Sequence, residues 1–335
     1  MEKILFKRNM ENVKKKTLHG CKEIMKFAQL GHCPVMKSES IDYLQIKPEG
    51  VYCDLTLGAG SHAMEIAKRL QTGKLIAIDR DSDAIELSRE KLKDYEDRIY
   101  FVNDNFVNIK SIVAELGYEK INGALIDLGI SSMQIDSDRG FSYIGDSPLK
   151  MTMEKDQQLT AATVVNTFEK DELKKILSDN GDEKYAGLIA GEIIKKRAEK
   201  PIETTLELAD IIKNSLKNVK YRSGHPAKKS FAAIRIFVND EINIIKPTLD
   251  SIEQILEKGG RLAVLSYHSG EDAVVKKCFG YYGKNCVCPP DFPVCVCKKR
   301  ATSKVITKKP VYPGEKERRE NPRSESAKLR VLEKL

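Results

Sequence analysis

The chain contains no tryptophan, and phenylalanine and tyrosine together make up only 7% of its 335 residues. A protein that binds single strands by stacking bases on a broad aromatic surface is therefore not expected. No apolar run approaches the roughly 18 residues that a membrane-spanning helix needs, so we expect no membrane association. The first residues, MEKILFKRNMENVKKK, lack the apolar core of a secretory signal, which predicts a cytoplasmic protein.

Charge, in contrast, is plentiful. Charged residues make up 32% of the chain and hydrophobic ones 41%, which is typical of a folded globular protein. The formal net charge is +8, and residues 298–335 alone carry 13 Lys and Arg against 5 Asp and Glu. Basic ends suit a polyanionic partner, most simply nucleic acid, although surface charge for solubility explains either end equally well.

A glycine-rich loop between two short apolar segments dominates the first third of the chain. In order, the sequence predicts a strand at Val51–Cys53 ending in Asp54, a turn at Gly58–Gly60, a helix from the N-cap Ser61 to Leu70, and a buried strand at Lys74–Asp79. Strand, glycine turn, helix and strand form the first unit of a doubly wound nucleotide-binding sheet.

The residues around this loop indicate which nucleotide it binds. Asp79 follows Gly60 by 19 residues, where such folds place the acid that bonds ribose hydroxyls. Gly58-x-Gly60-x-x-Ala63 also satisfies the dinucleotide pattern, so an NAD-dependent oxidoreductase stays open as an alternative. Asp54 would repel a pyrophosphate but attract a ligand ammonium, and His62 would crowd the pyrophosphate. These two residues favour S-adenosylmethionine.

Two further predicted strands end in residues that suit a ligand. Arg98–Val102 is followed by Phe106, and Asn122–Leu128 carries Asp127 near its end. Because the carboxyl ends of parallel strands meet at one edge of a sheet, we expect Asp54, Asp79, Phe106 and Asp127 to surround one ligand. Phe106 either flanks an adenine or is an ordinary buried loop residue, and the sequence leaves both open.

The alternation of strands and helices stops near residue 137 and resumes near residue 230. Helices are expected at Asp182–Lys200, after the capping box Thr204-x-x-Glu207, at Phe231–Ile245, and from Pro247 to a stop at Gly259-Gly260. A strand at Arg261–Tyr267 and a hairpin of Val305–Pro310 with Ala327–Glu333 follow. The chain thus divides into a basic extension (1–31), a nucleotide-binding domain (32–136 and 231–335) and an inserted helical domain (137–230).

Five of the eight cysteines lie between Cys278 and Cys297, in a Cys-rich loop at 278–300 of the nucleotide-binding domain. Cys286, Cys288, Cys295 and Cys297 form two Cys-x-Cys pairs around a proline-stiffened segment. Four thiolates so placed would hold a structural, tetrahedral zinc ion, while four reduced thiols in a cytosolic protein explain the pattern as well. No metal ligand is assigned from the sequence.

Six motifs together resemble the bacterial ribosomal RNA small subunit methyltransferase H family, in order and spacing, from residue 32 to 335. They are His32-Cys-Pro-Val35, Asp54-Leu-Thr-Leu-Gly-Ala-Gly-Ser-His62, Asp127-Leu-Gly-Ile-Ser-Ser-Met-Gln134, Arg139-Gly-Phe-Ser142, His225-Pro-Ala-Lys228 and Asn321-Pro-Arg-Ser-Glu-Ser-Ala-Lys-Leu-Arg330. The resemblance implies an α/β fold, the doubly wound Rossmann-like sheet of class I S-adenosylmethionine-dependent methyltransferases, with an inserted helical substrate-recognition subdomain. It also implies N(4)-methylation of one cytosine of 16S rRNA, in the decoding region of the small ribosomal subunit.

The resemblance further implies which residues contact the cofactor: Gly60, Ser61, His62, Asp79, Phe106, Asp127 and Gln134. A cytosine amine is a poor nucleophile because its lone pair is delocalised, so the enzyme must accept a hydrogen bond from its N–H. Asp127 is the candidate catalytic residue, with Ser131 or Ser132 as alternatives and His268 as a weaker general-base candidate. Phe141, Tyr143 or Tyr267 would pack on the unstacked base.

The chain departs from the family pattern at several positions. Lys150, Thr152 and Ala273 replace an acid and two arginines, and Ala59 and Ser61 stand where glycine is usual. These departures indicate a divergent member or a second copy. They leave open a non-catalytic small-subunit assembly factor of the same fold, while the oxidoreductase alternative rests on the glycine pattern alone. The sequence does not give the oligomeric state.

Overall fold

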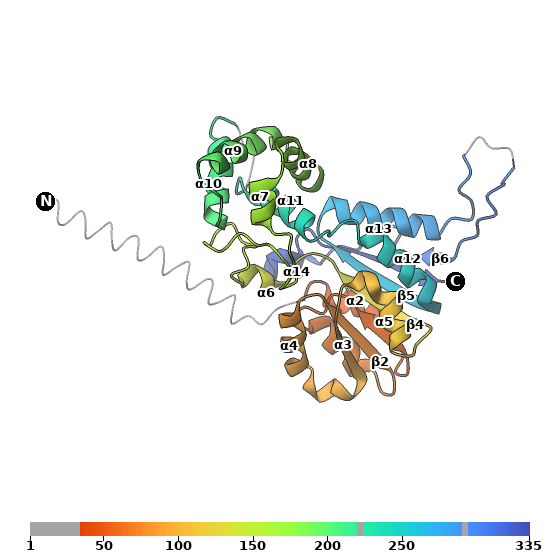
Figure 1. Ribbon diagram of the computed structural model, residues 1–335. Coiled ribbons are helices and arrows are strands. Elements are labelled where there is room, and N and C mark those ends of the chain that lie inside the picture. Colours follow the sequence, from red (N-terminus) through yellow and green to blue (C-terminus); the bar gives the residue numbers. More distant parts are fainter. Residues whose placement is uncertain (1–33, 220–223, 290–293) are drawn as a thin grey trace. The chain divides into compact units, whose positions relative to one another are not determined.

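The computed structural model of the chain describes residues 34–219, 224–289 and 294–335 (Figure 1). Residues Val35–Leu335 form one compact unit. The predicted basic extension at 1–31 and most of the motif at residues 32–35 lie outside the described residues. Among the described helices, none is long and apolar enough to cross a membrane.

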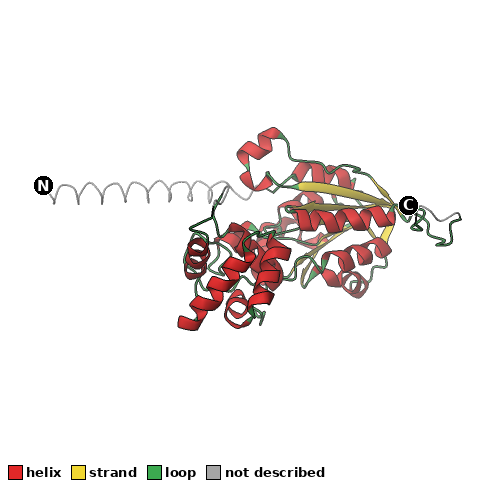
Figure 2. Cartoon of the chain, turned by 90° about the horizontal axis from the view of Figure 1, so that it is seen from above, coloured by secondary structure: helices red, strands yellow, loops and turns green. Residues whose placement is uncertain are grey.

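A seven-stranded sheet in the order β3-β2-β1-β4-β5-β7-β6 forms the centre of this unit (Figure 2). The strands are β1 (Val51–Asp54), β2 (Lys74–Asp79), β3 (Ile99–Asn103), β4 (Ile121–Asp127), β5 (Leu256–Ser266), β6 (Ser303–Val305) and β7 (Lys328–Lys334). Strands β1 to β5 are parallel to one another, and β7 runs antiparallel to both β5 and β6. The strand order reverses between β1 and β4, the place where doubly wound sheets bind ligands.

Helices cover both faces of the sheet. One face packs on α2 (Lys37–Leu44), α3 (Ser61–Arg69) and α4 (Ser82–Lys91), the other on α5 (Ile109–Glu115), α12 (Ile245–Ile255) and α13 (Ser269–Tyr282). Leu75 and Ala77 of β2 belong to the first core, and Ile76 and Ile78 to the second. Successive side chains of a strand point to opposite faces, so a strand covered on both sides needs a continuous apolar run such as KLIAID.

The chain between β4 and α12 is helical and has a hydrophobic core of its own. Its helices are α6 (Ser132–Asp136), α7 (Ala161–Thr167), α8 (Lys170–Gly181), α9 (Ala186–Glu199), α10 (Thr205–Ser215) and α11 (Lys228–Val238). Leu173, Ile189, Ile212 and Phe231 lie in a cluster separate from the two that flank the sheet. At the start of α10, Thr204 forms the predicted capping box with Glu207. We call the segment from α6 to α11 the helical block.

Three predicted boundaries are wrong. Helix α9 starts at Ala186, because Asp182 adopts φ 48° and ends α8. Helix α11 ends at Val238, and a turn through Asp240 at φ 52° separates it from α12. The pair Gly259-Gly260 does not stop a helix but lies within β5. A Cβ on Gly260 would come within 2.9 Å of the Asn122 carbonyl oxygen, so close backbone approach requires glycine there.

The predicted C-terminal hairpin is present, with a shorter first strand. Strand β6 covers Ser303–Val305 and pairs antiparallel with β7, Val305 lying opposite Leu332. The predicted segment therefore overlaps β6 only at its first residue. Between the two strands lies the short helix α14 (Glu315–Glu320), and the carboxylate of Glu317 accepts a 2.6 Å bond from the N–H of Met36.

Candidate active site

The loop between β1 and α3 holds two glycines in the left-handed region. Gly58 has φ 50° and Gly60 has φ 70°, a conformation that strains any residue with a Cβ. Gly60, not the predicted Ser61, is the N-cap of α3. The N–H of Gly58 donates a 2.8 Å bond to Oδ2 of Asp79, and its carbonyl accepts a 2.7 Å bond from the Ser88 hydroxyl. Strand β2 and helix α4 therefore hold the loop in place.

The first residues of α3 differ sharply in exposure. The Ser61 hydroxyl accepts a 3.1 Å bond from Nζ of Lys91 at the solvent side. His62 has a side chain only 7% exposed, and its Nδ1 lies 3.9 Å from Oδ2 of Asp127. Burial lowers the pKa of His62 to about 4, so the ring is neutral at pH 7. His62 therefore supplies shape and polarity but no positive charge.

Three carboxylates meet at the carboxyl ends of adjacent strands. Asp54 ends β1, Asp79 ends β2 and Asp127 ends β4, and β1 pairs with both of the other strands. Burial, together with the negative charges of Asp127 and Asp79, raises the pKa of Asp54 to about 7. We call these three residues the carboxylate rim. The effect of both negative charges on the pKa of Asp54 shows that the three carboxylates lie near one another.

The Asp54 carboxylate is nearly enclosed and only partly satisfied. The residue is 1% exposed, and its Oδ1 accepts a 3.2 Å bond from the Thr56 N–H. Its Oδ2 has no partner at hydrogen-bonding distance among the described residues, although the N–H of Ala63 lies near enough to favour the anion. A buried, unpaired carboxylate oxygen is unfavourable unless a ligand cation or donor meets it.

Asp127 is held by a tyrosine that the sequence did not assign to it. The Tyr267 hydroxyl, at the end of β5, donates a 2.6 Å bond to Oδ1 of Asp127, and the Asp127 N–H donates to Oγ1 of Thr56 at 2.7 Å. Burial raises the pKa of Asp127 to about 7, against the hydrogen bond from Tyr267, which lowers it. The carboxylate keeps 24% of its side chain exposed, so Oδ2 remains accessible.

Both carboxylate oxygens of Asp79 and both ends of the Gln134 amide are hydrogen-bonded to protein groups. Asp79 accepts bonds from the N–H groups of Gly58 and Asp81, and burial raises its pKa to about 6. The Gln134 amide donates a 3.0 Å bond to Oδ2 of Asp81, and its oxygen accepts from the Ser131 N–H. Arg139 donates to the same Asp81 oxygen at 2.5 Å. Asp81 therefore ties β2, α6 and the segment after it together.

The remaining predicted site residues lie around this rim. Phe106 starts a short 3-10 helix (Phe106–Asn108) directly after β3 and is half-buried against the core under α5. Ser131 is the N-cap of α6, where its hydroxyl accepts a 3.2 Å bond from the Gln134 N–H. One lone pair of Ser131 is thus engaged in capping the helix. Ser132 is the first residue of α6.

The helical block is joined to the rim by polar contacts. Arg80, directly after Asp79, forms a 2.8 Å ion pair with Glu154 and donates a 2.9 Å bond to the Asn239 carbonyl. Phe141 is 7% exposed within the core of the helical block, so its prediction as a base-stacking residue is wrong. Tyr143 stacks on His225 with ring centroids 4.6 Å apart. Of the three aromatic residues predicted to pack on the base, Tyr143 and Tyr267 are only partly buried.

The side chain of His268 caps a helix. It is the N-cap of α13, where its Nδ1 accepts a 3.4 Å bond from the Glu271 N–H and the Glu271 side chain bonds back. Of the positions that depart from the family pattern, Lys150 and Ala273 are exposed and Thr152 is buried. The lost acid at Lys150 and the lost arginine at Ala273 therefore change the charge of the surface.

Comparison with known proteins agrees with this geometry. A family model described as the MraW methylase family matches residues 29–335. A ribosomal RNA small subunit methyltransferase H from Clostridium botulinum (strain Kyoto / Type A2) is 49% identical over 306 residues, covering 91% of this chain and 99% of that protein. The protein of the same name from Halothermothrix orenii is 48% identical over 309 residues, with the same coverage. A solved rRNA methylase from Streptococcus thermophilus aligns over 89% of this chain and 95% of that one, at 15% identity and a TM-score of 0.42, too loosely to bear on function.

Proposed function

The chain belongs to the MraW methylase family, and on that premise we propose that it transfers a methyl group from S-adenosylmethionine to the N4 amine of a cytosine in 16S rRNA of the small ribosomal subunit. The carboxylate rim carries this proposal. Asp54, Asp79 and Asp127 accept bonds from backbone N–H groups and one tyrosine, and the described residues offer none of them a hydrogen-bonded cation. A ligand with a sulfonium and an ammonium group supplies the missing positive charge.

Each part of the cofactor has a suitable place at this rim. Asp54, with its unpaired Oδ2, would receive the ammonium, and Asp79 would bond the ribose hydroxyls. Phe106 would flank the adenine, and Gly60, Ser61 and His62 would line the loop beside the methionine part. We also place Gln134 in contact with the cofactor. Its hydrogen bonds to Asp81 and Ser131 make the carboxylate rim rigid.

The same residues argue against a nicotinamide dinucleotide. A pyrophosphate on the glycine loop would face the carboxylate of Asp54, whose pKa is already raised by burial and by two neighbouring acids. Adding further negative charge there is unfavourable. The Asp54 carboxylate next to the loop therefore outweighs the formal match of Gly58-x-Gly60-x-x-Ala63 to the dinucleotide pattern.

We assign Asp127 the role of accepting the amine proton. S-adenosylmethionine supplies an electrophilic methyl group, and the reaction forms an N–C bond as the S–C bond breaks, with the electron pair passing to sulfur. Asp127 Oδ2 accepts the hydrogen bond from the N4 amine and then the proton that the methylated nitrogen loses. Tyr267 holds Oδ1 so that Oδ2 faces the substrate. Ser131, engaged as a helix cap, is the weaker candidate.

The helical block would recognise the RNA around the target base. The cytosine must leave its stack to reach the rim, and Tyr143 and Tyr267 are the partly exposed aromatic residues that can pack on it. The exposed residues Lys150, His225 and Lys228 lie in or beside this block and suit contact with phosphates.

The test is to incubate the full chain with methyl-labelled S-adenosylmethionine and small subunits from cells that lack this modification. We expect label in 16S rRNA, as N4-methylcytosine by mass spectrometry. Asp127→Asn should keep cofactor binding by calorimetry within a few-fold while turnover falls about 100-fold or more. Cofactor binding without transfer to rRNA by the unmodified chain would favour the assembly-factor alternative, and full turnover by Asp127→Asn would remove the role assigned to Asp127.

A further inference from the structure

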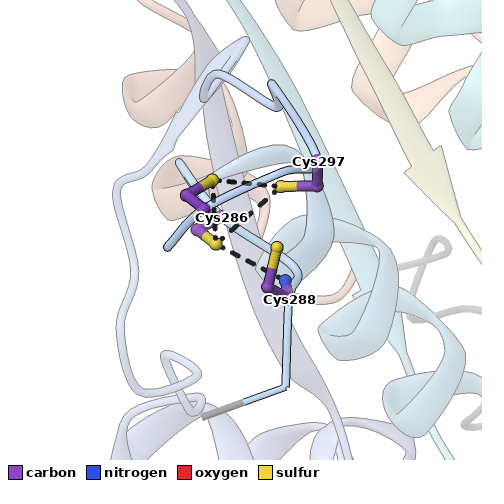
Figure 3. A group of neighbouring side chains, drawn as sticks. Cys286, Cys288 and Cys297 are labelled. Atoms are coloured by element: carbon purple, nitrogen blue, oxygen red, sulfur yellow. Dashed lines mark hydrogen bonds between the residues drawn. The ribbon is translucent and has the colours of Figure 1, made fainter. Parts of the chain in front are cut away.

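The loop between α13 and β6 brings four cysteines together on the surface. Cys286, Cys288, Cys295 and Cys297 each offer a sulfur atom, and these atoms all lie within 4.8 Å of one another. Figure 3 shows the side chains of Cys286, Cys288 and Cys297 directed toward a common centre. From this arrangement we propose that the four thiolates bind one zinc ion in a structural, tetrahedral site. The proposal does not depend on the proposed methyl transfer.

The sulfur spacing matches a zinc tetrahedron and not a disulfide. Sγ of Cys286 lies 3.4 Å from Sγ of Cys295 and 3.8 Å from Sγ of Cys297, and the Cys295 and Cys297 sulfurs are 3.6 Å apart. Zinc–sulfur bonds of about 2.3 Å give a tetrahedron with edges of about 3.8 Å. A disulfide requires sulfurs about 2.05 Å apart. The observed distances are therefore close to the edges of a ZnS4 tetrahedron.

Backbone N–H groups support the sulfurs as they do in zinc sites. The N–H of Cys288 donates to Sγ of Cys286, and the N–H of Val287 donates to Sγ of Cys297, both at 3.4 Å. The second bond joins one Cys-x-Cys pair to the other. Donors of this kind favour thiolate over thiol and orient the ligands. Lys298, Lys299 and Arg300, next to Cys297, offset the charge of −2 that four thiolates leave around Zn²⁺.

The described part of the loop has no hydrophobic core of its own. None of its described residues between Gly283 and Thr302 is buried, and Val287, Val294 and Val296 are exposed. The N–H of Ala301 donates to the Asn285 side chain, and the N–H of Thr302 donates to the Tyr282 carbonyl, which closes only the base of the loop. A surface loop without a core gains little free energy from packing, and a bound metal would provide it.

The site is structural because it lies far from the carboxylate rim. Helix α13 begins beside the carboxyl end of β5 and runs for 14 residues before the loop starts, a length of about 21 Å. In Figure 1 the loop extends beyond the end of α13 and away from the helical block. Four thiolates also leave zinc no open position for a substrate. The metal therefore orders the loop and takes no part in methyl transfer.

The experiment is metal analysis of the full chain purified without chelator. We expect about one zinc per chain, and less than about a tenth of that in Cys295→Ser/Cys297→Ser, as for sites with metal-linked folding. The matched control is Cys278→Ala, which removes a cysteine 5% exposed on α13 and should keep the full zinc content. The cobalt-substituted chain should show the visible bands of tetrahedral Co(II) with thiolate charge transfer.

A second measurement, limited proteolysis, tests whether zinc protects the loop from cleavage. Trypsin should cut after Lys284, Lys298 or Arg300 slowly in the zinc-bound chain, and at least tenfold faster in the double variant or after chelation, with circular dichroism unchanged because the cores are untouched. Zinc-free chain with four titratable thiols in this loop, iron in place of zinc, or two disulfides would overturn the proposal. So would full zinc content in the double variant.

Discussion

The hydroxyl of Tyr267 donates a 2.6 Å hydrogen bond to Oδ1 of Asp127, joining the ends of β5 and β4 at the point where the proposed amine would bind. The bond favours the charged form of Asp127 and opposes the burial that raises its pKa. Tyr267 is therefore a positioning residue for Asp127.

Replacing this tyrosine changes the pH profile more than the fold. In Tyr267→Phe the pKa of Asp127 should rise further, so the acidic limb of the kcat profile moves up by about one pH unit, the size expected for about 1.4 kcal/mol. Turnover at high pH should stay near that of the unmodified chain, because Phe preserves packing. Tyr312→Phe, at a position 56% exposed, is the control with an unchanged profile. If the acidic limb does not shift in Tyr267→Phe, Tyr267 does not influence the pKa of Asp127.

The second prediction uses the unpaired oxygen of Asp54. Asp54→Asn removes a buried charge, so the cofactor-free protein should gain about 1–2 kcal/mol in its free energy of unfolding at pH 8. The same change should weaken S-adenosylmethionine binding about 10- to 100-fold, since the ammonium loses a charged partner. Thermal melts with and without cofactor measure both effects.

Asp79→Asn is the matched control, and we expect it to change the stability of the cofactor-free protein in the opposite direction. Asp79 accepts bonds from the N–H groups of Gly58 and Asp81, and an amide can accept only one of them. The cofactor-free protein should therefore lose about 1–3 kcal/mol instead of gaining. Equal stability losses in both variants would show that Asp54 is satisfied in the cofactor-free protein.

The third prediction concerns pH. The folded-state pKa values of Asp54 and Asp127 are raised from 3.8 to about 7, so the folded chain keeps protons that the unfolded chain has lost. Their contribution to stability is complete below about pH 4 and is lost as the pH rises to about 7. The gain of Asp54→Asn over the unmodified chain should accordingly be small at pH 5 and largest above pH 7. Urea melts across this range test the sign.

The raised pKa of Asp54 should also make cofactor binding depend on pH. The ammonium group of S-adenosylmethionine binds the charged form of Asp54, so the cofactor should bind more tightly as the pH rises from 5.5 to 8 and should displace protons below pH 7. Calorimetry in two buffers of different ionisation enthalpy counts these protons. Proton uptake in place of release would contradict the placement of the cation at the rim.

The fourth prediction tests the link between the sheet and the helical block. Arg139 pairs with Asp81, whose side chain is 1% exposed, at 2.5 Å. Arg139→Ala leaves a buried acid with one donor fewer, and the free energy of unfolding should fall by about 3 kcal/mol. Arg319→Ala removes an ion pair with Glu315 in which both side chains are about 80% exposed, and should change stability by less than about 0.5 kcal/mol. Similar losses for both variants would show that Asp81 does not need Arg139.

Local signals in the sequence were sufficient for much of the sheet and the loop. The bounds of β2 agree with the predicted Lys74–Asp79, because an apolar run between a glycine and an acid is a strand signal complete in itself. The Thr204–Glu207 capping box was readable for the same reason, since both partners lie within one helical turn. The strand-end rule predicts Asp54, Asp79 and Asp127 at one edge of the sheet, and these residues do end β1, β2 and β4.

Contacts between distant segments could not be read in this way. Asp127 and Tyr267 are 140 residues apart, and nothing in either local sequence indicates that the hydroxyl meets the carboxylate. Phe141 carries the residue type of a base-stacking surface, and only the packing of the helical block buries it. Gly259-Gly260 has the composition of a helix stop but lies in β5, because the pairing of β5 with β4, which brings the Asn122 carbonyl oxygen close to Gly260, overrides local propensity.

The sequence by itself determined the alternation of strands and helices, the glycine loop, and the family motifs, because each depends on residues close together in the chain. The tertiary structure decided which oxygens are left without partners, which acids share one site, and how near four sulfurs come to one another. Those properties depend on distances between segments that only the folded chain brings together.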